Sequence, residues 1–585
     1  SVAKAPLTQT PAHLCAAPAP ARPASDCPRL SQSPSRRVLA GLLCVSLLGG
    51  TWSPQAQAQV NLPALGDTAS EDFNLGTERH LGDAIMRDIR RDPDYLDDPI
   101  LLEYLQSLWQ PLLAAARLRG DLGDDLNQRF SYQPFLVRDR SVNAFALPGG
   151  YMGVHLGLMA ITQTRDELAS VLAHEMTHIN QRHIARGFAN SKKQSLISAA
   201  AMIIGVLAAT RSGGGDAANA MIAGGQAVGI QGQLNFSREM EREADRIGSQ
   251  MMASAGFEPS GMASMFERLQ QSSSLNDSGG YPYLRSHPLT TERIGEARAR
   301  LGTAGLTSAP PLVSSPSTAL EHRAALARAR VLMDTRVDAL RRWQALDGEG
   351  SAASATLGER FADAYSSALA SSLLRDWVRA DASMSRASDI ARGGSAAVAS
   401  ISDVAATGAL PQRDARGERS VALLKVESFL HRGEPARAQA ILAPLTRSVG
   451  PVAAEAATTS RPVMVLAAQV ALAEGRSKEN AALRASADQL QTWVARYPDD
   501  AEVWSMLGRV SAQLGWALRS VRAEAESRYA SGDLPGAIDR LKAGQRLARS
   551  STTAVDFVES SVIDSRLRSI EAHRRQLLTE QLGYQ

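Results

Sequence analysis

The sequence predicts a mostly helical α+β domain with a small sheet, followed by an all-α helical solenoid. Two stretches between residues 130 and 156 have the composition of strands, and apolar residues at helical spacing flank them on both sides. Residues 319–585 are rich in Ala, Arg and Leu and have a helical pattern throughout. Residues 307–318 contain three prolines, so we expect a linker between the two parts.

Residues 1–58 are predicted to be a leader. Residues 1–35 are rich in Pro, Ala and Ser without an amphipathic period. Arg36-Arg37, an apolar run at 38–48 and Ala56-Gln57-Ala58 then have the layout of a secretory signal, with cleavage expected after Ala58. General secretion and twin-arginine export both remain open.

The cysteine content and net charge of residues 59–585 limit the functions that we expect for them. All three cysteines lie in the leader, so the mature chain would have no disulfide, which suits an oxidising periplasm. Removing residues 1–58 takes away five Lys/Arg and one Asp, which leaves 58 basic against 59 acidic residues, a net charge of −1. Nucleic-acid binding therefore has no support.

The first elements are predicted from periodicity. The pattern is helical from about Glu71 to Leu118, and residues 130–137 alternate as in a strand. Residues 142–156 predict a second strand or a hairpin, broken by Pro148-Gly149-Gly150. These glycines fit either an ordinary hairpin turn or a strand edge that an extended substrate backbone approaches closely.

The helix that contains His174 and His178 carries the most specific motif. The two histidines are four residues apart, so both imidazoles lie one turn apart and can converge on one zinc ion. Glu175 follows the first histidine and can reach a water beside the metal. Thr164 and Glu167 have capping-box spacing, so we expect the helix to begin there.

A third zinc ligand is expected on a separate helix around residues 237–251. Met240, Ala244, Ile247 and Met251 form an apolar stripe there. Glu241 and Asp245 share one face of this helix, whereas Glu239 and Glu243 share another, and periodicity does not choose between the pairs.

A family resemblance favours one of these pairs. His174-Glu175-x-x-His178 followed by Glu241-x-x-x-Asp245 resembles the gluzincin metallopeptidases of the HtpX and CAAX-prenyl-protease type. Residues 143–150 and Ser286-His287-Pro288-Leu289 with Arg293-Ile294 fit the same family. The helical C-terminal half narrows the resemblance to periplasmic BepA-like proteins.

The resemblance implies a role for each matching residue. It implies an α+β metalloprotease domain with one zinc on His174, His178 and Glu241, and an Asp245 carboxylate that orients a zinc histidine. His287 would lie near the zinc as a fourth ligand or as a transition-state donor, while a simple turn before Pro288 remains the alternative. An edge strand would align the substrate through Asn143, Ala144, Phe145, Gly149 and Gly150.

The segment between the two zinc-binding helices is unusually apolar. Residues 196–210 and 217–230 are small and apolar, and a glycine-rich breaker separates them. The first run is shorter than the ~20 residues that span a membrane. We expect a helical hairpin or mobile lid near the active site, with a buried core hairpin as the alternative. On the first interpretation this segment would contact outer-membrane proteins or make a peripheral contact with the membrane face.

The C-terminal half is interpreted as degenerate tetratricopeptide repeats. Trp504-x-x-Leu507-Gly508 fits the start of such a repeat, and turn signals lie at Gly433, Gly475, Gly515 and Gly532. Their spacing is irregular, so a plain helical bundle remains open. Either arrangement would offer a surface for a protein partner.

Together these features predict a leader at residues 1–58, a zinc metallopeptidase domain at 59–306, a linker at 307–318 and helical repeats at 319–585. The resemblance implies a periplasmic zinc metalloendopeptidase that degrades misfolded or stalled outer-membrane proteins and docks on their assembly machinery. The alternative is a periplasmic chaperone or scaffold whose zinc site is closed by His287.

Overall fold

The computed structural model describes residues 74–189, 237–274, 281–304, 319–348, 355–393, 413–447, 460–475, 481–549 and 554–583. All of these belong to one compact unit that runs from Gly66 to Gln585. The predicted leader, the apolar segment at 196–230 and the linker at 307–318 lie outside the described residues, so these three expectations stay predictions.

A four-stranded mixed sheet lies in the N-terminal part. The strands are β1 (Tyr95–Leu96), β2 (Gln133–Val137), β3 (Ala144–Leu147) and β4 (Tyr151–His155). Their order is β1-β2-β4-β3; β2 and β4 are parallel, and the other two pairs are antiparallel. The predicted hairpin is present because the 3-10 turn η1 (Pro148–Gly150) joins β3 to β4, and β3 forms one edge of the sheet.

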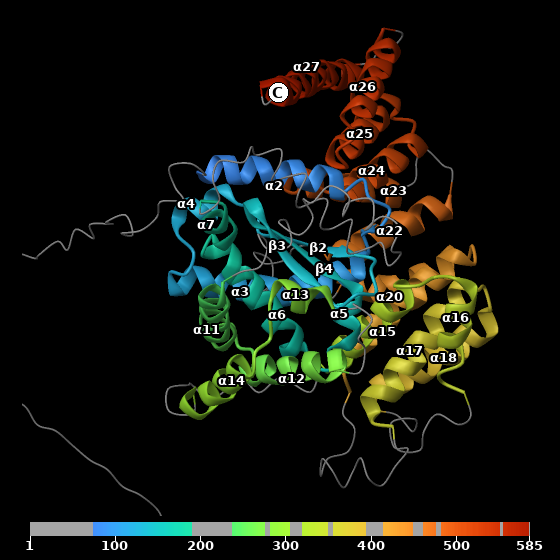
Figure 1. The fold of residues 1–585 in the computed structure, drawn as a ribbon. Coiled ribbons are helices and arrows are strands. Elements are labelled where there is room, and N and C mark those ends of the chain that lie inside the picture. Colours follow the sequence, from blue (N-terminus) through green and yellow to red (C-terminus); the bar gives the residue numbers. More distant parts are fainter. Residues whose placement is uncertain are drawn as a thin grey trace, which may run out of the picture. The chain divides into compact units, whose positions relative to one another are not determined.

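Helices cover both faces of this sheet (Figure 1). Side chains alternate along each strand. Phe135, Val137, Leu147 and Tyr151 face a cluster that includes side chains of α2 (Leu75–Ile89). Leu136, Ala144, Met152 and Val154 belong to the main core, with α3 (Pro99–Arg119) and α6 (Arg165–Asn180). The sheet and α6 therefore share one hydrophobic core.

The helical pattern expected from about Glu71 to Leu118 corresponds to two helices, α2 and α3. The backbone leaves the helical conformation after α2, forms β1, and resumes a helix where Pro99 occupies the first turn of α3. Asp98 caps that helix by accepting a hydrogen bond from the Leu101 amide at 2.8 Å. The prolines at positions 93 and 99 explain the break, because proline does not continue a preceding helix.

The N-terminal part contains further helices. They are α4 (Asp124–Arg129), α5 (Leu156–Ile161), α7 (His183–Ala189), α11 (Arg238–Ser254), α12 (Ser260–Ser274), α13 (Pro282–Ser286) and α14 (Thr291–Ala304). Of these, α7, α11 and α12 contact α6. The stripe predicted on α11 points inward, since Ala244, Ile247 and Met251 are buried.

The described C-terminal part is entirely helical apart from its connections, which confirms the predicted fold class. Its helices are α15 (Ala319–Leu332), α16 (Val337–Gln344), α17 (Leu357–Leu373), α18 (Trp377–Ala391), α20 (Ala415–His431), α21 (Pro435–Arg447), α22 (Arg461–Glu474), α23 (Ala481–Arg496), α24 (Ala501–Gln513), α25 (Ala517–Ala530), α26 (Leu534–Ala548) and α27 (Ala554–Gly583). None of the described helices combines the length and the apolar character needed to cross a lipid bilayer.

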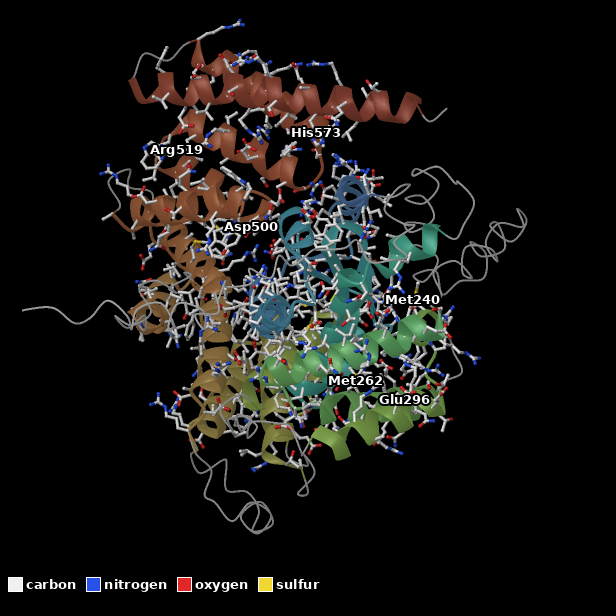
Figure 2. All side chains as sticks on the ribbon, turned by 90° about the vertical axis from the view of Figure 1, so that its left-hand side faces the viewer. Met240, Met262, Glu296, Asp500, Arg519 and His573 are labelled. Atoms are coloured by element: carbon white, nitrogen blue, oxygen red, sulfur yellow. The ribbon has the colours of Figure 1, made fainter. Side chains whose placement is uncertain are left out.

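Three of the four predicted turn glycines join consecutive helices in a left-handed conformation. Gly433, Gly515 and Gly532 have φ angles of 73°, 79° and 81°, which only glycine adopts without cost. Helices α24 to α27 then pack in sequence order. Figure 2 labels Asp500, Arg519 and His573 along this region. The pattern suits helical repeats, and their assignment as tetratricopeptide repeats stays a prediction.

One buried and one partly buried set of ion pairs joins the C-terminal helices to the N-terminal part. Arg328 of α15 contacts Asp98 and Glu427, both at 2.7 Å. Arg461 of α22 contacts the neighbouring Asp97 at 2.8 Å and also Asp500, the cap of α24, at 2.7 Å. Two adjacent aspartates before α3 therefore each bind an arginine from a different C-terminal helix. The division into domains at residues 306 and 319 stays a prediction.

Candidate metal centre

Helix α6 brings His174, Glu175 and His178 into the interior. Thr164 caps the helix by accepting a hydrogen bond from the Glu167 amide at 3.2 Å, as its spacing predicts. Glu167 itself accepts from the Gln163 amide and binds Arg268, so the reciprocal half of a capping box is missing. The three motif side chains are fully or almost fully buried.

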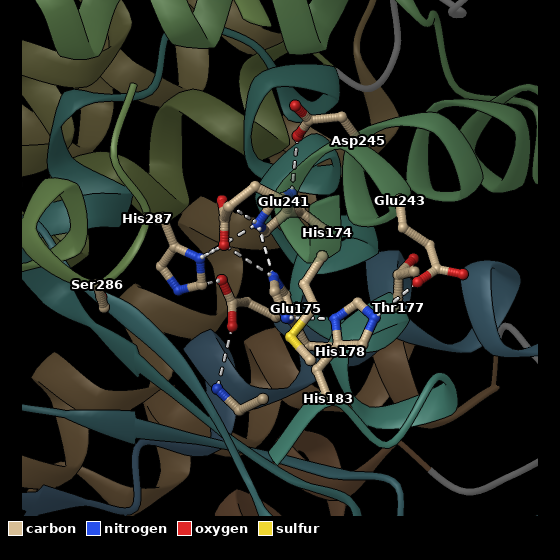
Figure 3. Close-up of polar contacts among 12 residues, drawn as sticks. His174, Glu175, Thr177, His178, His183, Glu241, Glu243, Asp245, Ser286 and His287 are labelled. Atoms are coloured by element: carbon tan, nitrogen blue, oxygen red, sulfur yellow. Dashed lines mark hydrogen bonds and ion pairs between the residues drawn. The ribbon is translucent and has the colours of Figure 1, made fainter. Parts of the chain in front are cut away.

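Helix α11 supplies the carboxylates that face these histidines. Glu241 and Asp245 lie one turn apart on α11 and are buried beside α6 (Figure 3). The structure thus brings together the pair that the family resemblance favours. His287 follows α13 as its C-cap residue and is buried next to Glu241.

Four side chains converge to form a candidate metal site: His174, His178, Glu241 and His287. One ligand atom from each lies within 4.8 Å of the others. The two Nε2 atoms of His174 and His178 are 3.0 Å apart, and each lies 3.5 Å from a carboxylate oxygen of Glu241. Two nitrogens bound tetrahedrally at about 2.0–2.1 Å from zinc would be about 3.3 Å apart. The donor set and its spacing therefore fit one zinc ion.

Further side chains hold the candidate ligands in place. Asp245 Oδ1 lies 3.0 Å from Nδ1 of His174, the nitrogen that faces away from the cluster. Arg293 donates two hydrogen bonds to Asp245, at 2.7 and 2.8 Å, and lies 2.8 Å from Glu241. Burial alone would lower the pKa of His174, but its contacts with Asp245 and Glu241 raise it to about 9. Such carboxylate–histidine contacts orient metal ligands.

Glu175 connects the candidate metal site to the edge strand. Its Oε2 accepts a hydrogen bond of 3.0 Å from the Ala146 amide of β3 (Figure 3). No donor among the described residues forms a hydrogen bond with its other oxygen, Oε1, which lies 3.4 Å from Nε2 of His287. Burial raises the pKa of the Glu175 carboxyl, which suits a group that takes up a proton.

The residues predicted to contact substrate divide into two groups. Asn143 immediately precedes β3, and Ala144 and Phe145 are the first residues of this edge strand, which also carries Ala146. Gly149 and Gly150 lie in η1 with φ angles of 76° and 87° and are buried. A Cβ atom on either would approach backbone atoms of α2 or of residue 132 within 3.1 Å. These glycines therefore serve the turn and its packing, and contact of any of the five residues with substrate stays a prediction.

Sequence reasoning missed His183 and the contacts of Glu243 and Arg293. His183 Nδ1 lies 2.8 Å from Nδ1 of His178, and its Nε2 lies 3.1 Å from Oε2 of Glu243. The histidine five residues after His178 was a signal for the first contact. The family resemblance includes Arg293, but no sequence pattern indicated its contacts with Asp245 and Glu241, which depend on tertiary packing.

The motif, its geometry and the surrounding fold agree with a known peptidase family. The model of peptidase family M48 matches residues 105–301, which include α6, α11 and His287. Metalloprotease LoiP of Escherichia coli is 30% identical over 190 residues, which are 32% of this chain and 68% of that protein. The chain belongs to peptidase family M48. Family M48 uses zinc, so the predicted family and cofactor are confirmed.

Longer relatives cover more of this M48 chain. The putative beta-barrel assembly-enhancing protease of Vibrio cholerae is 36% identical over 294 residues, 50% of this chain and 56% of the relative. The beta-barrel assembly-enhancing protease of Escherichia coli K12 is 29% identical over 265 residues, 45% of this chain and 52% of the relative. The chain thus spans about half the length of these two relatives.

Proposed function

We propose that this M48 protein is a zinc metalloendopeptidase of the periplasm that acts on outer-membrane β-barrel proteins. The observation that carries the proposal is the convergence of His174, His178 and Glu241 beside the buried carboxylate of Glu175. Three protein ligands plus a general base are the parts that metal-assisted peptide hydrolysis requires.

Each side chain has one task in the proposed reaction. His174, His178 and Glu241 would hold the zinc, which when bound polarises the scissile carbonyl and makes water a stronger nucleophile. Glu175 accepts the proton of the attacking water at Oε1, the oxygen that has no hydrogen bond in the described structure, and then delivers it to the leaving amine. Asp245 keeps His174 oriented through its 3.0 Å contact.

The edge strand β3 provides a way to bind an extended peptide. The His155 amide donates to the carbonyl of residue 143 at 3.0 Å, so residues 143, 145 and 147 bond to β4 while the backbone groups of 144 and 146 point away from β4. The amide of residue 146 already donates to Glu175, so residue 144 presents its backbone groups at the outer edge of β3. A peptide that adds to this edge is recognised through its backbone. We therefore propose broad selectivity for unfolded or stalled chains.

The cellular role follows from the relatives and the leader. Two relatives carry the name beta-barrel assembly-enhancing protease, and residues 36–58 have the layout of a secretory signal. We propose that the protein degrades misfolded outer-membrane proteins or assists their assembly, and that the C-terminal helices contact the assembly machinery.

The first test is zinc-dependent cleavage of an unfolded model protein, such as casein, by the mature chain. Glu175→Gln should lower kcat by about 10²–10⁴ because the general base is lost, whereas zinc content should be unchanged. Glu292→Gln is the matched control, because Glu292 lies on the surface of α14 with its side chain 59% exposed. Equal activity of Glu175→Gln and wild type would contradict the mechanism.

A second candidate function is a scaffold or chaperone with a latent zinc site. The contact of His287 Nδ1 with Glu241 at 2.9 Å, and with Nε2 of His174 at 3.3 Å, favours it, because His287 could be a fourth ligand. His287→Ala should raise cleavage if His287 blocks the site and lower it if His287 stabilises the transition state. If wild type and His287→Ala both bind zinc and both fail to cleave, the scaffold function is favoured.

A further inference from the structure

His178 has a contact on the side of its ring that faces away from the candidate metal site. Its Nε2 faces Glu241 and His174, at 3.5 and 3.0 Å. Its Nδ1 lies 2.8 Å from Nδ1 of His183, whose Nε2 lies 3.1 Å from Oε2 of Glu243. Figure 3 shows these side chains in a row from the cluster toward Glu243.

Zinc binding to His178 would determine which ring nitrogen carries the proton in both His178 and His183. A nitrogen that binds zinc carries no proton, so a neutral His178 that binds through Nε2 has its proton on Nδ1. That proton is donated to Nδ1 of His183, which must accept it and therefore carries its own proton on Nε2. The Nε2–H of His183 then donates to the carboxylate of Glu243. No other arrangement of neutral rings satisfies both short contacts.

The turn before His183 contains a residue in an unusual backbone conformation that a buried contact holds in place. Arg182 separates α6 from α7 and adopts a φ angle of 51°, in the left-handed region that non-glycine residues rarely occupy. Such a conformation costs about 1–3 kcal/mol and persists where the surroundings enforce it. Here Arg182 Nε donates to the buried Glu78 at 3.0 Å. The turn thus returns the chain so that the fully buried His183 reaches His178.

We propose that His183 and Glu243 are positioning residues, which fix the tautomer and ring orientation of His178 as a metal ligand. The proposal rests on the proposed zinc site. The two histidines of α6 are then oriented by two carboxylates of one helix, α11. Asp245 contacts His174 directly, whereas Glu243 acts on His178 through the His183 imidazole. Glu243 is the more accessible end of this row, because its side chain is 29% exposed and that of Asp245 is fully buried.

The experiment measures the zinc affinity of the purified mature chain by competition with a chromophoric chelator. His183→Phe keeps a ring but removes the acceptor for His178, and should weaken zinc binding about 10–100-fold. His183→Asn places an oxygen close to the position of Nδ1, so it should regain part of the lost affinity. Glu243→Gln keeps the length but not the charge and should weaken binding by less than His183→Phe.

Two control variants separate the proposed row from its surroundings. Arg186 also contacts Glu243, at 3.3 Å, so Arg186→Gln removes that ion pair and leaves the row intact. Glu239 lies one turn before Glu243 on α11 and is exposed, so Glu239→Gln removes an acidic charge without touching the row. Both controls should bind zinc within about twofold of wild type.

The outcomes distinguish this proposal from the proposed function. Wild type that binds no zinc would overturn both. Wild-type affinity in His183→Phe, or equal losses in Glu243→Gln and Arg186→Gln, would overturn the positioning role alone. If His183→Phe fails to fold, the zinc affinity of Glu243→Gln, at the partly exposed end of the row, decides whether the positioning role holds. Unfolding of each chelator-treated variant is measured as well, because a purely structural role would lower that stability without changing the zinc affinity of folded protein.

Discussion

Replacing Arg328 by Met should destabilise the protein by about 3–5 kcal/mol, because the change leaves two carboxylates without their cation in the interior. Arg328 donates to both oxygens of Asp98 and to both oxygens of Glu427, over distances of 2.7 to 3.0 Å. The exposed fractions of the three side chains are 4%, 8% and 18%. Water therefore has little access to the two carboxylates that lose their arginine, and hydration replaces little of the lost interaction.

The assay is urea unfolding of the mature protein, followed by tryptophan fluorescence and by circular dichroism. Arg336→Met is the matched control, because Arg336 pairs with Asp334 while 76% exposed and should cost about 0–1 kcal/mol. Adding Asp98→Asn and Glu427→Gln to Arg328→Met should restore much of the stability, since no uncompensated charge remains and Asn still caps α3. An Arg328→Met variant within 1 kcal/mol of the control would refute the reasoning.

Three further predictions concern packing, acidity and zinc. Leu172→Ala in the fully buried face of α6 should cost about 2–5 kcal/mol, whereas Leu118→Ala at an 89% exposed position should change stability by less than about 0.5 kcal/mol in the same unfolding assay. The hydrogen bond from Arg432 lowers the pKa of Asp381 below 3.8. The ionised Asp381 carboxylate therefore stabilises the folded protein above that pH, and this contribution is lost as the pH falls below it. The unfolding midpoints of wild type and Asp381→Asn should accordingly converge as acid is added. Removal of zinc by a chelator should lower the melting temperature, and free zinc at 100 times its Kd should restore about 2.7 kcal/mol in calorimetry; an unchanged melting temperature would argue against a zinc-bound native state.

The candidate metal site was largely predictable from the sequence, because two of its four side chains come from one short motif on one helix. His174 and His178 are one turn apart on a single helix, so their convergence follows from helix geometry alone. The choice of Glu241 over its neighbours required the family resemblance. The structure shows why periodicity could not choose: Glu241 and Asp245 face the ligands, while Glu243 on another face contacts His183.

The parts that sequence reasoning missed depend on contacts between distant segments. The helical pattern over residues 71–118 gave no sign of β1, a two-residue strand between α2 and α3 that pairs with β2, because so short a strand leaves almost no pattern in the sequence. Arg328 resembles any other arginine of a charged helix, and the motif that contains Arg293 does not name its partners; only the fold brings each arginine to buried carboxylates. Gly149 and Gly150 were correctly placed in a turn, but the backbone that occupies their surroundings could not be read from composition.

The adjacent Asp97 and Asp98 before α3 also constrain the order in which the tertiary structure can be completed. Asp98 is bonded to a residue 230 positions later, and Asp97 to one 364 positions later. Both arginines must therefore be present in the compartment where the chain folds before either contact can form. Until α15 and α22 are there, the N-terminal half has two carboxylates without their arginines, and its packing is incomplete.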